Sequence, residues 1–328
     1  MPPSPIRVAV LCGGRSGEHE ISLRSAESVI AAMNPAKFAV ERIFIDKNGK
    51  WSPRTIVPEP GSNPGIDVVF PVLHGTFGED GTVQGLLDLA DLPYVGSGVL
   101  GSAASMDKEI TKRILHERGI PVAEYVAVAN GRWDEDEICE KLGFPMFVKP
   151  ANLGSSVGIS KVKRREDLRA ALQEAAQYDR YVIIERGIVG REFECSVMGN
   201  ADPIAAVPCE ILPSREFYDY EDKYLLGTSR TELPAKLAVE QVERIRALAV
   251  ECYKALRCEG LARVDFLMEE STGLFYVNEP NTMPGFTSIS MYPKMWEAAG
   301  VSYSQLIEQL IELAFDRHRQ RQSLRYSR

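Results

Sequence analysis

An arginine, two acids and an asparagine in the C-terminal third of the chain have a spacing that suits metal-assisted phosphate chemistry. Arg263 and Asp265 share one face of an expected strand, because side chains alternate along a strand. Glu279 and Asn281 follow the next apolar run and can converge on that face. Two carboxylates and an amide oxygen are hard ligands that suit Mg²⁺. The alternative is a surface hairpin in which Arg263 forms an ordinary salt bridge with a neighbour.

A lysine at the end of an apolar strand marks a second candidate site. Lys149 is followed by the glycine- and serine-rich segment 151–158. One fixed cation and a set of backbone N–H groups can bind a polyphosphate. This is not a Walker A loop, because no Gly-Lys-Ser/Thr follows and a strand is expected next. The alternative is an ordinary flexible hairpin loop.

A glycine-rich turn at residues 13–17 separates the first expected strand from the first expected helix. The G-x-G-x-x-G spacing of dinucleotide-binding turns is absent, and Glu18 at the helix start would repel a pyrophosphate. A carboxylate at this place suits the ammonium group of an amino-acid substrate. The alternative is that Glu18 caps the helix.

The elements that must position these residues begin with a βα pattern. Apolar runs at 8–12 and 67–73 predict strands, and helical spacing follows each of them, at 22–33 and 82–89. This order implies a parallel sheet with crossover helices. Because sites in such sheets lie beyond the carboxyl ends of the strands, the turns after Cys12 and Leu73 both qualify.

Beyond residue 106 the pattern changes to a charged helix, 107–118, and then to short strands alternating with helices. The segment 213–234 has no sustained period, and we interpret it as a lid over a site. The other expected strands are 146–149, 159–162, 181–185, 192–198, 203–207, 262–268 and 274–278, and the other expected helices are 165–178, 238–256 and 303–318.

Composition excludes several classes of protein. A chain of 328 residues is expected to divide into two or three units with clefts between them. The net charge of -8 argues against binding to nucleic acid, which requires a basic face. The six cysteines form no C-x-x-C pair, so we expect buried free thiols. Neither a membrane span nor a secretory signal is visible, and we expect a cytoplasmic location with no membrane partner.

Together these residues resemble the D-alanine:D-alanine ligase family of the ATP-grasp superfamily, from Val8 almost to the last expected helix. The markers occur in order along the chain, and chance does not plausibly place all of them. They are Gly13-Gly14-x-Ser16-x-Glu18, Leu73-His74-Gly75 with Gly78-Glu79-Asp80-Gly81, Tyr94-Val-Gly-Ser-Gly98, Ser105-Met-Asp-Lys108, Lys149-Pro150 with Gly154-Ser-Ser-Val-Gly158, Phe217-Tyr-Asp-Tyr-Glu-Asp-Lys-Tyr224, and Asn278-Glu279-x-Asn281-Thr-Met-Pro-Gly285-Phe-Thr.

The resemblance implies an α/β fold of three units, in which two antiparallel sheets of an ATP-grasp part enclose ATP. These units would be a substrate domain at 1–105, a central subdomain at 106–190, and a C-terminal subdomain at 191–328 with the lid at 213–234. It further implies two Mg²⁺ ions, which Mn²⁺ can replace, on Asp265, Glu279 and Asn281. The residues implied around ATP are Lys108, Lys149, Ser155, Ser156, Glu185, Arg186, Ile188, Glu192, Tyr218, Lys223, Leu267 and Asn278.

By the same resemblance, two D-alanines are joined through a D-alanyl phosphate, to supply a precursor of peptidoglycan. Arg263 and the backbone N–H of Gly285 would stabilise the tetrahedral oxyanion. Further implied residues are Glu18 with His74 for the first D-alanine, Ser288 or Ser290, with Ser290 preferred, for the carboxylate of the second, and a triad of Glu18, Ser155 and Tyr224 that closes the lid. A structural role for His74 stays open.

Two other functions are alternatives to the joining of two D-alanines. One is an ATP-grasp ligase that takes a different amino acid, since a fold alone does not fix a substrate. The other is a nucleotide-binding regulator without catalysis, which would be expected to lack some of Arg263, Asp265, Glu279 and Asn281, yet all four are present. A homodimer is expected because dimers are common in the family.

Overall fold

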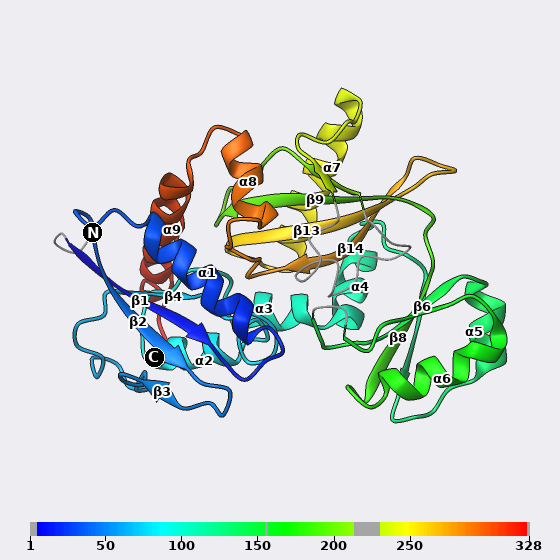
Figure 1. Cartoon of the computed structure of the whole chain (residues 1–328), viewed down its shortest axis with the longest axis horizontal. Coiled ribbons are helices and arrows are strands. Elements are labelled where there is room, and N and C mark those ends of the chain that lie inside the picture. Colours follow the sequence, from blue (N-terminus) through cyan, green and yellow to red (C-terminus); the bar gives the residue numbers. More distant parts are fainter. Residues whose placement is uncertain (1–4, 155–156, 213–229, 327–328) are drawn as a thin grey trace.

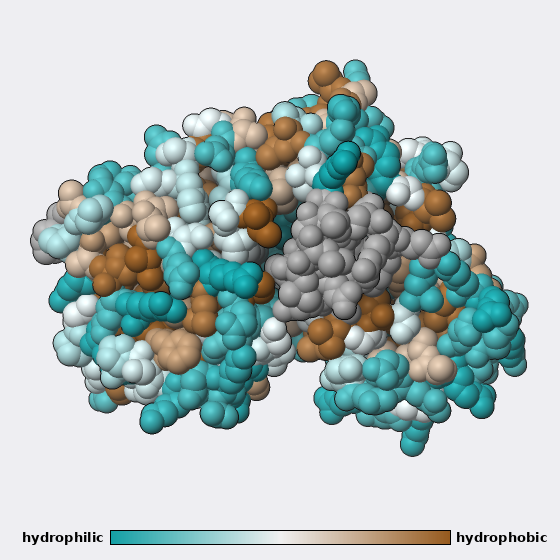
Figure 2. Space-filling view, in the orientation of Figure 1, coloured by the Kyte–Doolittle hydropathy of each residue, from teal (hydrophilic) through white to brown (hydrophobic). Residues whose placement is uncertain are grey.

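The structure, a computed structural model, describes residues 5–154, 157–212 and 230–326. Within these ranges the strands form three sheets. Figure 1 shows helices packed on each sheet, with the strands β6 and β8 standing apart from the strands β1 and β2. On the molecular surface the part that carries β6 and β8 forms a separate lobe (Figure 2).

The first sheet has the order β3-β2-β1-β4, and β1 runs parallel to both of its neighbours. Alternation along β1 sends Val8 and Val10 into one core and Ala9 and Leu11 into another, so both faces of the sheet are covered. Its elements are β1 (Ile6–Gly13), β2 (Phe38–Ile45), β3 (Trp51–Ser52) and β4 (Val68–Pro71), with the helices α1 (His19–Ala32), α2 (Thr82–Leu89) and α3 (Val99–Met106).

The second sheet is antiparallel, with the order β5-β8-β6-β7. The helices α5 and α6 share one core with it, and that core includes Val148, Leu168 and Ile184. Its elements are β5 (Tyr125–Ala129), α5 (Glu135–Leu142), β6 (Met146–Pro150), β7 (Ser160–Val162), α6 (Arg165–Ala175) and β8 (Tyr181–Arg186), and α4 (Lys108–Glu117) precedes them.

The third sheet is also antiparallel, with the order β12-β11-β9-β13-β14 and β10 paired to β9. Val264 and Phe266 of β13 pack into the core with α7, while Arg263 and Asp265 alternate onto the other face. Its elements are β9 (Gly190–Gly199), β10 (Ile204–Ala205), β11 (Cys209–Leu212), β12 (Arg230–Glu232), α7 (Val239–Ala255), β13 (Gly260–Glu269) and β14 (Phe275–Asn281).

The last two helices, α8 (Met291–Ala298) and α9 (Tyr303–Gln322), return to the first sheet. Leu306 and Leu310 of α9 lie in the same buried cluster as Val8 and Val10 of β1. The C-terminal helix therefore completes the core of the N-terminal sheet, and α9 lies beside β4 in Figure 1.

Most expected elements are present, and one expectation is corrected. The predicted lid, 213–234, ends too late, because residues 230–232 form β12 and pair with β11. Residues 213–229 lie outside the described residues. The six cysteines are free thiols and five of them are buried, as expected. No helix of the described ranges combines the length and apolar character needed to cross a membrane.

Candidate active site

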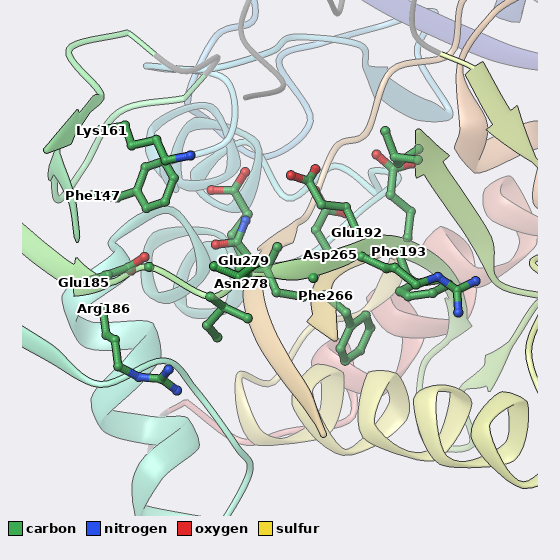
Figure 3. Close-up of a pocket in the computed structure, with 18 of the residues that line it drawn as sticks. Phe147, Lys161, Glu185, Arg186, Glu192, Phe193, Asp265, Phe266, Asn278 and Glu279 are labelled. Carbon is green, nitrogen blue, oxygen red and sulfur yellow. The ribbon is translucent and has the colours of Figure 1, made fainter. Parts of the chain in front are cut away.

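A cleft of about 430 Å³ lies between the second and third sheets. Lys149 and Glu185 come from β6 and β8 on one side, and Asp265 and Glu279 come from β13 and β14 on the other. Figure 3 shows Phe147 and Lys161 projecting from the second sheet toward the side occupied by Glu279 and Asp265. The cleft therefore joins one wall that carries lysines to another that carries carboxylates.

Two lysines share one buried carboxylate at the inner end of the cleft. The Lys149 Nζ lies 2.7 Å from one oxygen of Glu185, and the Lys112 Nζ lies 3.1 Å from the other. Burial alone would raise the pKa of Glu185, but these two cations outweigh it and lower the pKa below its usual value. Two positive charges against one negative charge leave the cluster with a net positive charge, which suits a phosphate.

Asp265 and Glu279 lie directly opposite each other across β13 and β14. Like charges in this position destabilise a sheet unless a cation lies between or beside them. Arg263 supplies one cation, since its guanidinium donates to both Asp265 oxygens at 2.7 Å. The side-chain oxygen of Asn281, which is buried, accepts no hydrogen bond within the described part of the chain. Two facing carboxylates beside an unused amide oxygen fit the ligand preferences of Mg²⁺.

Lys108 connects this carboxylate pair to the loop after β6. Its Nζ donates to the carbonyl oxygen of Leu153 at 2.7 Å and lies 3.5 Å from a carboxylate oxygen of Glu279. Because Lys108 is the first residue of α4 and is buried, its ammonium group is held at the junction of the two sheets.

Glu18 lies where the N-terminal unit meets the same loop. A Cβ built on Gly154 would be 3.2 Å from a carboxylate oxygen of Glu18, so the two segments are in close contact. Glu18 is the residue before α1, but its side chain forms no capping hydrogen bond. Glu18 thus occupies the N-cap position of the helix-cap alternative without the side-chain hydrogen bond of a cap.

Glu79 is a second buried acid beside Glu18. It accepts hydrogen bonds from the N–H groups of Gly75 at 2.6 Å and Met283 at 3.2 Å. Burial, reinforced by the charge of Glu18, raises the pKa of Glu79 to about 8. Glu79 is therefore mostly protonated at pH 7, and the carboxylate of Glu18 is the negative charge that suits an ammonium group.

His74 is buried, and both of its ring nitrogens have partners within the protein. Nδ1 is 2.9 Å from the carbonyl oxygen of Met283, and Nε2 is 3.1 Å from the hydroxyl of Ser25. Burial lowers the pKa of His74 to about 4, so the ring is neutral at pH 7. These contacts favour the structural alternative for His74, although one ligating atom each of His74, Glu18 and Glu79 lie within 4.8 Å of one another.

Gly285 and Ser290 lie side by side in the turn that follows β14. A Cβ on Gly285 would be 2.7 Å from the Ser290 hydroxyl oxygen, so a larger residue would displace this side chain. Ser290 Oγ also accepts the N–H of Thr287 at 3.0 Å. Ser288 is exposed, whereas Ser290 is half-buried, and of the two candidates Ser290 is the one beside Gly285.

The remaining expected nucleotide residues divide into three groups. Ile188, Glu192, Leu267 and Asn278 line the cleft. Arg186 lines it as well, but its guanidinium points away and pairs with Glu269 at 2.8 Å (Figure 3). Ser155, Ser156, Tyr218 and Lys223 lie outside the described residues, and so does Tyr224, which was expected in the lid triad.

Sequence reasoning missed several residues that line the cleft or lie behind it. Phe147 and Lys161 line the cleft, and alternation along β6 places Phe147 on the same face as Lys149. Lys112 follows Lys108 by one helical turn, so its position beside the site could have been inferred from the helical period. Ser25 carried no comparable signal, because its partners are far away in the sequence.

Comparison with known families and proteins covers nearly the whole chain. The family model described as "D-ala D-ala ligase N-terminus" matches residues 7–64 and 57–97, and the one described as "D-ala D-ala ligase C-terminus" matches residues 114–312. A D-alanine–D-alanine ligase of Solibacter usitatus is 63% identical over 323 residues, which are 98% of this chain and 99% of that protein. A D-alanine–D-alanine ligase of Thermoanaerobacter sp. is 49% identical over 96% of this chain and 98% of its own length.

Two solved structures of ligases also match nearly the whole chain. The D-alanine–D-alanine ligase from Coxiella burnetii superposes with a TM-score of 0.88 at 38% identity, over 98% of this chain and 97% of that one. A D-Ala:D-Ser ligase from Enterococcus faecalis gives a TM-score of 0.86 at 37% identity, over 95% of this chain and 100% of that one. The fold of nearly the whole chain thus occurs in solved structures of ligases.

Proposed function

The chain belongs to the D-alanine–D-alanine ligase family, and from this premise we propose how its residues carry out the ATP-dependent joining of two D-alanines. The proposal rests on one observation above all. The facing carboxylates of Asp265 and Glu279 lie across a cleft from the buried pair of Lys149 and Glu185. Glu18 contacts the loop after β6, the strand that carries Lys149.

ATP occupies the cleft between the second and third sheets. Lys108 and Lys149 contact its phosphates, while Glu185, Ile188 and Glu192 lie near the adenosine. Arg186, Leu267 and Asn278 line the same space, and Ser155, Ser156, Tyr218 and Lys223 complete the nucleotide site from the segments outside the described residues. The buried positive charge at Lys112 and Lys149 supports the placement of the phosphates beside Lys149.

Asp265, Glu279 and Asn281 would hold two Mg²⁺ ions, for which Mn²⁺ could substitute. When bound, these ions neutralise charge on the phosphates during transfer. The unused buried oxygen of Asn281 and the two facing carboxylates support this assignment. Arg263, whose guanidinium donates to Asp265, would lie beside these metal ligands and donate to the substrate.

Activation of the first D-alanine precedes bond formation, because a carboxylate does not react with an amine at neutral pH. Glu18 binds the ammonium group of this D-alanine, and the buried Glu79 lies beside Glu18. A carboxylate oxygen attacks the γ-phosphorus, the bond to the β-phosphate oxygen breaks, and D-alanyl phosphate and ADP form.

The second D-alanine then attacks the carbonyl carbon of D-alanyl phosphate through its neutral amine. Arg263 and the N–H of Gly285 donate to the oxyanion of the tetrahedral species, and the species collapses with release of phosphate and a proton. Ser290 binds the carboxylate of the second D-alanine, with Ser288 as the alternative. A triad of Glu18, Ser155 and Tyr224 closes the site, which keeps water away from the acyl phosphate.

The three units divide this work as a substrate domain at 1–105, a central subdomain at 106–190 and a C-terminal subdomain at 191–328. The enzyme acts in the cytoplasm as a homodimer, and its dipeptide product supplies peptidoglycan synthesis. These points rest on the family resemblance.

The test is phosphate release from Mg²⁺-ATP with D-alanine alone, and with L-alanine, D-serine or D-lactate added to D-alanine, followed by mass analysis. Release with D-alanine alone and the mass of D-alanyl-D-alanine are the expected results. A mixed product formed in preference to the dipeptide would show another acceptor, an alternative raised by the resemblance to a D-Ala:D-Ser ligase. Nucleotide binding with no phosphate release under any condition would favour a regulator.

A further inference from the structure

A buried serine of α1 connects the N-terminal unit to the turn that carries Gly285. The Ser25 side chain is fully buried, and its oxygen accepts the backbone N–H of Phe286 at 3.2 Å. The same oxygen lies 3.1 Å from Nε2 of His74. Ser25 therefore contacts a residue 261 positions away in the sequence and a second residue 49 positions away.

The positions of the protons in this network follow from the groups themselves. The carbonyl oxygen of Met283 can only accept, so Nδ1 of His74, 2.9 Å away, must carry the ring proton. Nε2 of the neutral ring is then an acceptor, and the Ser25 hydroxyl donates to it. The N–H of Phe286 donates to a lone pair of the Ser25 oxygen. Each group thus donates a hydrogen bond to the next, from the N–H of Phe286 to Ser25, from Ser25 to His74, and from His74 to the carbonyl oxygen of Met283.

The turn from Met283 to Phe286 is held at both ends by hydrogen bonds to the N-terminal unit. The N–H of Met283 donates to Glu79 at 3.2 Å, and its carbonyl oxygen accepts from His74, so both backbone groups of Met283 are bound by the N-terminal unit. Phe286 is held by Ser25. Gly285 lies between the two held residues, so the peptide that carries its N–H is flanked on both sides by peptides that the N-terminal unit holds in place.

We propose that Ser25 is a positioning residue, which acts through His74 and the N–H of Phe286 to aim the Gly285 N–H at the oxyanion. The inference rests on the proposed role of Gly285. It assigns to the N-terminal unit a second task besides binding D-alanine, because the same unit aligns the donor that the second chemical step requires. The neutral state of His74 is part of the device, since a protonated ring could not accept from Ser25.

Ser25→Ala is the main variant, and Ser22→Ala is its matched control. Ser22 is also a fully buried serine of α1, but its hydroxyl bonds to Gly13 and Val72 within the N-terminal unit. Both changes remove one buried hydroxyl, so both are expected to lower stability by similar amounts. Only Ser25→Ala releases the turn 283–286.

The decisive measurement is the ratio of ADP formed to dipeptide formed. In Ser25→Ala, acyl phosphate still forms but its capture by the second amine slows, and water hydrolyses it to D-alanine and phosphate. We expect kcat for the dipeptide to fall about tenfold or more with the KM for ATP nearly unchanged, since displacing an oxyanion donor costs up to about 10²–10³ in rate. The ADP-to-dipeptide ratio should rise above one in Ser25→Ala and stay at one in Ser22→Ala.

A spectroscopic readout tests the network without reference to activity. Nitrogen-15 NMR of labelled histidines, with His74→Asn for assignment, should show His74 as the Nδ1–H form, unchanged between pH 5.5 and 8. An Nε2–H form, or titration in that range, would overturn the proposal. So would a ratio of one in Ser25→Ala while the parent enzyme makes dipeptide. Absence of dipeptide from the parent enzyme would instead refute the proposed function itself.

Discussion

Replacing Glu185 by glutamine tests the charge balance behind the phosphate site. The carboxylate pairs with Lys149 at 2.7 Å and with Lys112 at 3.1 Å, and all three side chains are buried. At an effective dielectric constant of about 20, each contact represents a gross attraction of about 5–6 kcal/mol. Desolvation offsets most of this in the intact cluster, but glutamine leaves two buried ammonium groups without an anion. We expect the free energy of unfolding to fall by about 3–5 kcal/mol.

Urea unfolding followed by circular dichroism measures this change, and two companion variants interpret it. Lys112→Met combined with Glu185→Gln removes one of the stranded charges, so the double variant should recover a large part of the loss. Asp136→Asn breaks the exposed pair with Arg165 and should leave the midpoint where it was.

The acid dependence of the same measurement has a defined sign. Because the cluster lowers the pKa of Glu185, its stabilisation is complete above the ordinary glutamate pKa of about 4.3 and is lost as pH falls through the lowered value. The stability difference between the parent and Glu185→Gln should therefore be constant near neutrality and shrink only in acid. A loss below about 1 kcal/mol at pH 7, typical of an exposed pair, would refute the reasoning.

Three further predictions concern the carboxylates and the turn after β14. Asp265→Asn should reduce the rate about a hundredfold, equivalent to about 3 kcal/mol, and a Mg²⁺ titration of the rate should show weaker activation. Because folding raises the pKa of Glu79 to about 8, its contribution to stability is complete below about pH 4.3 and is lost as pH rises through about 8. The parent's free energy of unfolding, measured by thermal unfolding, should therefore fall over this pH range by at most about 1.4 kcal/mol per pH unit. In Glu79→Gln the free energy of unfolding should depend less on pH. Gly285→Ala places a Cβ 2.7 Å from the Ser290 oxygen, so the KM for the second D-alanine should rise, and an unchanged KM would argue against Ser290 as its ligand.

Elements with regular periodicity could be predicted from the sequence, often to within a residue or two. The helix at 82–89 was predicted with both ends correct, and the hairpin of β13 and β14 followed from alternation. The strand β2 was not predicted because Glu41 and Arg42 interrupt its apolar pattern. The helix α5 was missed because only Ile138 and Leu142 are buried along its charged sequence.

Some residues of the candidate site could be predicted from the sequence, and others could not. Lys149, Asp265 and Glu279 could be identified because their residue types and spacing imply a charge-bearing strand end. Ser25 could not, since it looks like an ordinary polar residue of a helix, and Lys112 was missed although the helical period places it one turn after Lys108. Their significance depends on partners that only the folded chain brings close, such as Glu185 for Lys112 and Phe286 for Ser25.

The position of α9 has a consequence for how the protein is made. Leu306 and Leu310 fill the same core as Val8 and Val10, so the core around β1 is completed by a helix that is synthesised much later. Such distant contacts cannot form until nearly all of the chain is available. Although α1 packs on β1, the part of this core that α9 fills stays open until α9 is synthesised, and chaperones can bind it in that period.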